Sequence, residues 1–250
     1  MSYHSDHKVS PLAESGLATK NPEEVTGQSM RESGEETELP TRVLAVGSLK
    51  TPNLYLHCPQ KYEGGKWPKG KYIALSHCWG EKPPLRTTKD KLDTYKGRID
   101  PSELPRTFLD AVTVAREIDV QYLWIDSLCI IQDDSEDWEK ESQKMEQVFS
   151  SAYCTISATS AKNSHEGFLP FPVKEAVRIL DGEKSQFAVY ACIADKSFKQ
   201  AVDEDGLLNT RGWVLQERAL SRRTIHFTGS QIFWECGSVI RYDNLSQRAG

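Results

Sequence analysis

Three short apolar runs, each followed by polar residues, constrain the fold of this chain more than any other feature. The runs are Tyr72–Ser76, Val120–Ile125 and Ala152–Ser157. Each has the length and the β-branched or aromatic content of a buried strand. Because ligands bind where the strands of an α/β domain end, the polar residues at the ends of the first two runs are candidates for a site.

The segments between these runs have helical periodicity. After Pro105, whose fixed φ suits the first turn of a helix, apolar residues fall on one helical face: Phe108, Leu109, Val112, Ala115 and Ile118. The acidic residues 133–137 favour the start of a second helix, with a predicted core stripe of Trp138, Met145, Val148 and Phe149. This alternation predicts right-handed crossovers and a parallel sheet with helices on both faces.

The chain before the first run divides into a tail and a folded part. Residues 1–40 are rich in Glu, Ser, Gly, Thr and Lys, with only isolated apolar residues. Such a segment buries too little surface to offset its ordering entropy, so we predict a disordered tail. Residues 41–250 then form one domain, in which 42–46 and 53–57 have the composition of two short strands.

The pattern changes after the third run. Residues 163–183 are predicted to form a loop and 186–193 a further strand, and Asn209 could cap a following helix. Residues 224–242 alternate strand-like and turn-like segments, which predicts an antiparallel meander. The predicted fold class is therefore α/β, a parallel sheet flanked by helices with an added C-terminal antiparallel β meander.

Composition and charge exclude several classes of function. The net charge of -5 provides no field that would attract nucleic acid, and the neighbouring Arg218, Arg222 and Arg223 are better explained as solvated helix-end charges than as a basic patch. No apolar run reaches the roughly 18 residues that a membrane span needs. The first residues lack the layout of a secretion signal. We therefore expect a cytoplasmic protein that binds neither nucleic acid nor membrane.

The six cysteines do not form a recognisable metal or disulfide pattern. They contain no CxxC pair, and four lie within apolar strand-like runs. In a reducing compartment this distribution is typical of small buried hydrophobic residues. The sequence therefore predicts no metal site.

The first run ends in Ser76, His77, Trp79 and Gly80, the first group of candidate binding residues. Gly80 would let the chain turn and a ligand approach the backbone, and Trp79 offers a flat face for a base or a pyridine ring. Alternatively, Trp79 and His77 only pack beneath the following loop.

Asp126 and Ser127 lie at the corresponding end of the second run, so they should converge on the same crevice. A carboxylate at this position could hold ribose hydroxyls or a cation. It could equally cap the backbone of the loop that follows.

A third polar group lies near the end of the chain, where Glu217 follows Trp213 by one helical turn. This spacing places the indole and the carboxylate on one helical face. Arg211, Arg218 and Arg222 surround Glu217 in sequence; arginine would keep the carboxylate ionised, whereas burial beside Trp213 would favour its neutral form. The alternative is a structural Glu–Arg pair at a helix end.

Familiar catalytic constellations are not supported. Ser76, His77 and Asp126 are the residue types of a hydrolytic triad, but adjacent strand residues point to opposite faces. Nothing places Cys78 or Cys129 in the electropositive environment that a nucleophilic thiolate needs. The sequence also lacks GxGxxG and GxxxxGK[ST], so standard dinucleotide and P-loop sites are not indicated.

The chain resembles the fungal heterokaryon incompatibility (HET) domain in five blocks that occur in the family's order. They lie within residues 71–242 and read ALSHCWG, LPRTFLDAV, YLWIDSLCIIQD, DWEKESQKMEQVFSSA and GWVLQER. The family is similar in fold to TIR domains, which implies a TIR-like (flavodoxin-like) sheet. The resemblance also implies a role in non-self recognition and programmed cell death.

Residues 213–217 look like the Trp-containing helix that carries the glutamate of NAD-cleaving TIR domains, although residues 160–208 depart from the compact TIR spacing. This likeness implies Glu217 as the catalytic residue, with Trp79 or Trp213 flanking the nicotinamide ring. It further implies that Asp126 and Ser127 position the ribose and that Arg218 meets the pyrophosphate. NAD would then be a substrate, and no bound cofactor is expected.

A function from a different class is also compatible with this resemblance. The domain could be a non-catalytic signalling module that assembles with itself or with a partner receptor. An enzyme requires Glu217 in a solvent-reached crevice with Trp79 or Asp126. An interaction module would leave Glu217 paired and the crevice filled.

Overall fold

The computed structural model describes residues 36–169, 177–180, 189–191, 196–206, 208, 212–229, 231–237 and 239–242. Residues 1–35 of the predicted 1–40 tail lie outside the described residues. Asn209 and Arg211 also lie outside them. Glu36 opens the described part, and a short strand β1 (Thr37–Glu38) follows it, paired with β4 (Lys69–Gly70).

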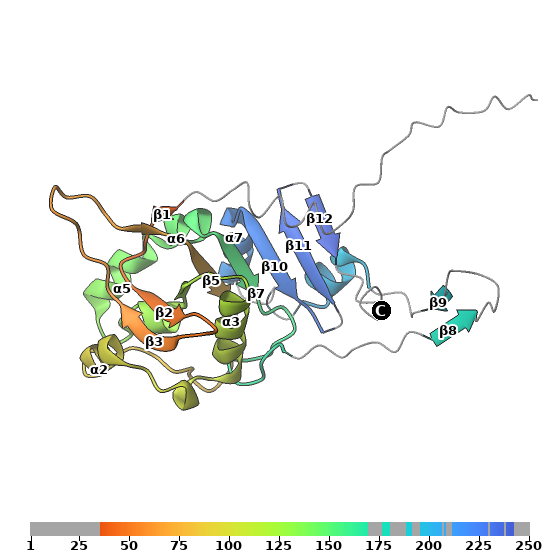
Figure 1. The fold of residues 1–250 in the computed structure, drawn as a ribbon, viewed down its shortest axis with the longest axis horizontal. Coiled ribbons are helices and arrows are strands. Elements are labelled where there is room, and N and C mark those ends of the chain that lie inside the picture. The colour runs from red at the N-terminus through yellow and green to blue at the C-terminus, as the bar shows by residue number, and fades with distance from the viewer. Residues whose placement is uncertain are drawn as a thin grey trace, which may run out of the picture. The chain divides into compact units, whose positions relative to one another are not determined.

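An eight-stranded mixed sheet forms the framework, with strand order β12-β11-β10-β7-β5-β6-β2-β3 (Figure 1). Its strands in chain order are β2 (Val43–Gly47), β3 (Pro52–His57), β5 (Tyr72–Ser76), β6 (Tyr122–Trp124), β7 (Cys154–Ser157), β10 (Arg223–Phe227), β11 (Ile232–Cys236) and β12 (Val239–Tyr242).

The four strands β6, β5, β7 and β10 run parallel, as predicted for the centre of the sheet. Both flanks are antiparallel. The β2–β3 hairpin joins β6 at one flank, and β11 and β12 follow β10 at the other. The prediction of a parallel sheet therefore holds for its centre only, and the C-terminal strands β11 and β12 extend the same sheet in antiparallel fashion.

Helices connect the parallel strands. Between β5 and β6 lie α2 (Leu92–Gly97), a short 3-10 turn (Pro101–Glu103) and α3 (Arg106–Glu117), which begins after Pro105 as predicted. Between β6 and β7 the predicted single helix is wrong, because the chain forms α4 (Asp126–Cys129), α5 (Ser135–Ser142) and α6 (Met145–Ser151). The helix breaks at Gln143–Lys144, and Trp138 on α5 is 54% exposed instead of lying in the core.

The segment after β7 contains one strand that the sequence did not predict. Val177–Leu180 form β8 inside the predicted loop, and β8 pairs with β9 (Val189–Ala191) in a separate two-stranded sheet. A π-helical turn follows at Lys199–Glu204, and α7 (Gly212–Leu220) leads into β10.

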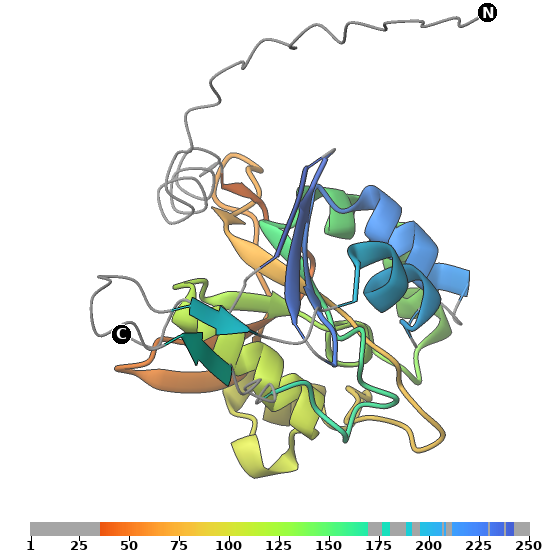
Figure 2. The ribbon, with the colours of Figure 1, turned by 90° about the vertical axis from the view of Figure 1, so that its right-hand side faces the viewer.

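Side chains alternate along β5 and attach helices to both faces of the sheet. On one face the Tyr72 hydroxyl donates to the carbonyl of Val148 in α6, and Ser76 meets α7. On the other face the His77 ring, just past the end of β5, packs edge-on against Phe108 of α3. Figure 2 shows α3 and α7 on opposite sides of the sheet.

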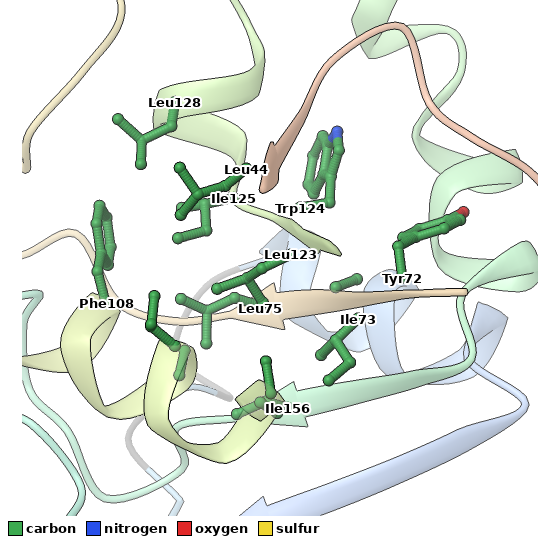
Figure 3. Packing of buried hydrophobic residues seen from close by; sticks show 14 of the residues in the cluster. Leu44, Tyr72, Ile73, Leu75, Phe108, Leu123, Trp124, Ile125, Leu128 and Ile156 are labelled. Carbon is green, nitrogen blue, oxygen red and sulfur yellow. The ribbon is translucent and has the colours of Figure 1, made fainter. Parts of the chain in front are cut away.

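The hydrophobic core lies between the central strands and α3, and continues toward α6. Leu75, Leu123 and Ile156 gather around β5 beside Phe108 of α3 (Figure 3). Trp124 packs edge-on against Phe149 of α6, with 5.8 Å between ring centroids. This burial fixes β5, β6 and α6, which carry three walls of the site described next. Among the described residues, no helix is both long and apolar enough to cross a bilayer.

Candidate functional site

A cleft of about 410 Å³ opens beyond the ends of β5 and β6, beside α5, α6 and α7. It brings together one residue from each of the three polar groups that the sequence singled out: Trp79, Asp126 and Glu217. The rest of its described lining is Ile130, Gln132, Trp138, Ser142, Gln143, Met145, Glu146, Phe149, Gln216 and Leu220.

Glu217 is held in place from the end of β5. The Ser76 hydroxyl, itself buried, donates a hydrogen bond of 2.5 Å to Glu217 Oε2. Ser76 therefore lies behind the carboxylate instead of in the cleft, and its role in this structure is to orient Glu217.

Trp79 and Asp126 form a second fixed pair. The indole Nε1 of Trp79 donates to Asp126 Oδ2 at 2.8 Å, and Asp126 Oδ1 accepts from the backbone N–H of Ser127 at 2.7 Å. The Asp126 carboxylate thus links the segment after β5 to the segment after β6 and fixes the orientation of the Trp79 indole. Ser127 is buried, and its hydroxyl donates to the carbonyl of Leu85, which gives it a structural task.

His77 and Gly80 do not line the cleft. His77 is buried on the α3 face, with its ring centroid 5.0 Å from that of Phe108. Gly80 has φ of +79°, as the predicted turn requires, and a Cβ at this position would lie 2.3 Å from Asn163 Cβ. The close approach that demands glycine is therefore to the 161–169 loop.

The 161–169 loop is bonded to α3, and it packs against the turn at Gly80. The buried carboxylate of Asp110 accepts hydrogen bonds from the backbone N–H groups of Phe168 and Leu169 at 2.7 and 2.9 Å. Arg106 forms an ion pair with the same side chain. The turn that presents Trp79 thus rests on a fixed support.

Arg218, predicted to meet a pyrophosphate, belongs to a separate ionic cluster outside the described lining of the cleft. Its guanidinium donates two hydrogen bonds to Glu235, at 2.9 and 3.1 Å, and a third to Asp203 at 2.6 Å. Adjacent residues of α7 thus project differently, Glu217 toward Ser76 and Arg218 toward β11. Arg222 is exposed, and only the backbone of Trp213 is described.

His226 completes this cluster. Its Nε2 lies 2.9 Å from Glu235 Oε2. Burial lowers the pKa of His226. Burial opposes ionisation of Glu235 as well, but the hydrogen bonds from His226 and Arg218 outweigh it and lower the pKa of Glu235 to about 2. The ionised Glu235 therefore links Arg218 of α7 to the C-terminal strands.

Sequence reasoning missed the α5–α6 wall of the cleft. Of the predicted core stripe, Val148 and Phe149 lie in the core and Met145 packs against it, whereas Trp138 is exposed. Trp138, Met145 and Phe149 also line the cleft, which the sequence did not indicate. One signal was available for Trp138. It lies among Glu136, Asp137, Glu139 and Lys140, and an isolated indole in so charged a helix is typical of an exposed aromatic contact.

None of the cysteines in the described part of the chain lines the cleft. Burial raises the pKa of both Cys129 and Cys154 to about 12, and Cys78 is buried as well. Within the described part of the chain no cluster of His, Cys, Asp and Glu could hold a metal ion. The chemistry that the cleft can support is electrostatic, through carboxylates beside indoles.

The chain matches the model of a known family. The model of the family described as "Heterokaryon incompatibility protein (HET)" matches residues 72–217, which begin at β5 and end at Glu217. No curated protein and no solved structure matches the chain.

Proposed function

The chain belongs to the heterokaryon incompatibility (HET) family, and from this premise we propose that it acts in fungal non-self recognition and programmed cell death by cleaving NAD in the Trp79–Asp126–Glu217 cleft. The observation that carries the proposal is the convergence of these residues, from three distant parts of the chain, on one open cleft. The protein would act in the cytoplasm.

The proposed reaction breaks the bond between the nicotinamide nitrogen and C1′ of the ribose. The bonding electrons leave with the pyridinium, which becomes neutral nicotinamide, and positive charge develops on the ribosyl carbon. The Glu217 carboxylate, oriented by Ser76, would stabilise this charge, as carboxylates do at oxocarbenium-like centres. Water then adds to C1′ and loses a proton, and the product is ADP-ribose.

The strand order supports a TIR-like crevice. Numbered in chain order, the parallel strands β6, β5, β7 and β10 lie in the order 2-1-3-4, the order of flavodoxin-like sheets. In such sheets the ligand binds at the ends of the strands where the order reverses. Trp79 follows β5, the strand at which the order reverses, and it lines the cleft.

The proposal is tested by nicotinamide release from NAD, measured with purified protein at high concentration or under crowding to favour self-association. We expect Glu217→Gln to abolish turnover while the protein stays folded. Glu139→Gln makes the same change of charge on an exposed face of α5 outside the cleft and should leave turnover unchanged. Equal activity of wild type and Glu217→Gln would overturn the assignment.

A second candidate function is a non-catalytic module that assembles with itself or with a partner receptor. The Ser76–Glu217 hydrogen bond favours it, because it gives the carboxylate a structural task. Wild-type protein that is demonstrably oligomeric yet releases no nicotinamide would establish this function over the enzyme.

A further inference from the structure

We infer that the cleft selects a planar organic cation, the N-ribosylated pyridinium, and leaves the diphosphate of a dinucleotide outside. This inference rests on the proposed function and adds to it the part of the substrate that the cleft recognises. It predicts that a pyridinium riboside without any phosphate is bound in its own right.

The charge of the cleft is the first support. Three carboxylates line it, Asp126 from α4, Glu146 from α6 and Glu217 from α7. Among its described lining residues there is no lysine, arginine or histidine. Negatively charged carboxylates around a concave surface raise the local concentration of cations and repel phosphate.

The aromatic walls are the second support. Trp79 and Trp138 both line the cleft, and tryptophan is the side chain whose ring face attracts a cation most strongly. The hydrogen bond to Asp126 already fixes the Trp79 indole, so its ring loses little further freedom when a ligand stacks on it. Trp138, at 54% exposure, remains available from solvent.

The position of Arg218 is the third support. It was the residue expected to meet a pyrophosphate, and its guanidinium is instead shared between Glu235 and Asp203. Moving it to a diphosphate would leave Glu235, which is partly buried, without its bidentate partner. The cleft volume of about 410 Å³ lies toward the lower end of small-molecule sites, which favours a nucleoside-sized part of the substrate.

Matched ligands test the inference on Glu217→Gln protein, which under the proposed function should not consume them. Nicotinamide riboside carries one positive charge, reduced nicotinamide riboside has nearly the same size and no charge, and AMP is an anion with an aromatic base. Calorimetry should show nicotinamide riboside binding at least about tenfold more tightly than its reduced form. AMP should not displace it.

Two further variants locate the binding. Glu146→Gln removes an exposed carboxylate of the cleft, and it should weaken nicotinamide riboside binding several-fold without changing the affinity for the reduced form. Trp138→Ala should weaken both ligands, the cation more. Equal affinity for the charged and reduced ribosides, or displacement by AMP, would overturn the inference.

The outcomes separate this inference from the proposed function. Selective binding of nicotinamide riboside without nicotinamide release by wild-type protein would remove the enzyme proposal and keep the cation site. Release of nicotinamide from NAD without any preference for the charged riboside would keep the enzyme proposal and remove the cation site.

Discussion

The Ser76 hydroxyl donates a 2.5 Å hydrogen bond to the carboxylate of Glu217, and so ties the end of β5 to α7. We expect Ser76→Ala to lower kcat for nicotinamide release by about 10- to 100-fold, since a hydrogen bond to a charged group contributes about 1.5–3 kcal/mol. KM should change less, because Ser76 lies behind the carboxylate. Steady-state kinetics with NAD measures both.

Ser157→Ala is the control for this variant. Ser157 is the register partner of Ser76 on β7 and is also buried, but its hydroxyl bonds to Thr159 instead of Glu217. It should affect stability without a comparable loss of kcat. Equal losses in the two variants would mean that the hydroxyl supports the strands and not the carboxylate.

Two tryptophans should differ sharply in their effect on stability. Trp138→Ala should change the free energy of unfolding by no more than about 0.5 kcal/mol, because the side chain is 54% exposed. Trp124→Ala should cost about 3–5 kcal/mol, because Trp124 is 1% exposed and packs against Phe149. Urea denaturation of both variants checks this, and a large loss in Trp138→Ala would contradict its exposed position.

Gly80→Ala should destabilise the turn that presents Trp79. The residue has φ of +79° and its new Cβ would lie 2.3 Å from Asn163 Cβ. Gly64→Ala is the matched control, since φ is +92° there and no atom lies within 4 Å of the added Cβ. We expect about 1–2 kcal/mol for Gly64→Ala from backbone strain alone, and about 1–3 kcal/mol more for Gly80→Ala. Equal losses in thermal unfolding would refute the close contact with Asn163.

The Glu235 cluster should make stability depend on acid pH. Glu235 stays ionised in the folded protein down to a pKa of about 2, whereas its ordinary value is 4.5. The stability it contributes is therefore complete above about pH 4.5 and is lost as the pH falls toward 2. Glu235→Gln should cost about 1–2 kcal/mol at neutral pH, an amount reduced by partial exposure. Its unfolding free energy should also vary less between pH 4.5 and 2 than that of the wild type; an unchanged pH dependence would contradict this origin.

The central part of the fold could be predicted because it depends on local pattern. The runs that became β5, β6 and β7 are short and apolar, and Pro105 marks the start of α3. The antiparallel pairing of β2 with β6 could not be predicted in the same way, because it joins segments far apart in sequence. The break between α5 and α6 was missed because Gln143 and Lys144 are ordinary helix formers.

The site was only partly accessible to sequence reasoning. The ends of adjacent parallel strands must lie close together, so the convergence of Trp79 and Asp126 follows from topology. The direction of individual side chains does not. The Ser76 hydroxyl, predicted to contact a ligand, donates to Glu217, and the Arg218 guanidinium, predicted to meet a pyrophosphate, donates to Glu235 on β11.

The spacing of the cleft residues along the chain also sets the time at which the cleft is completed during synthesis. Trp79 and Asp126 leave the ribosome well before α7, and β5, β6 and β7 are complete before Glu217 is made. A growing or interrupted chain therefore contains the cleft residues from Trp79 to Phe149 but lacks Glu217. Under the proposed function, an unfinished chain lacks the carboxylate that would stabilise the developing ribosyl charge.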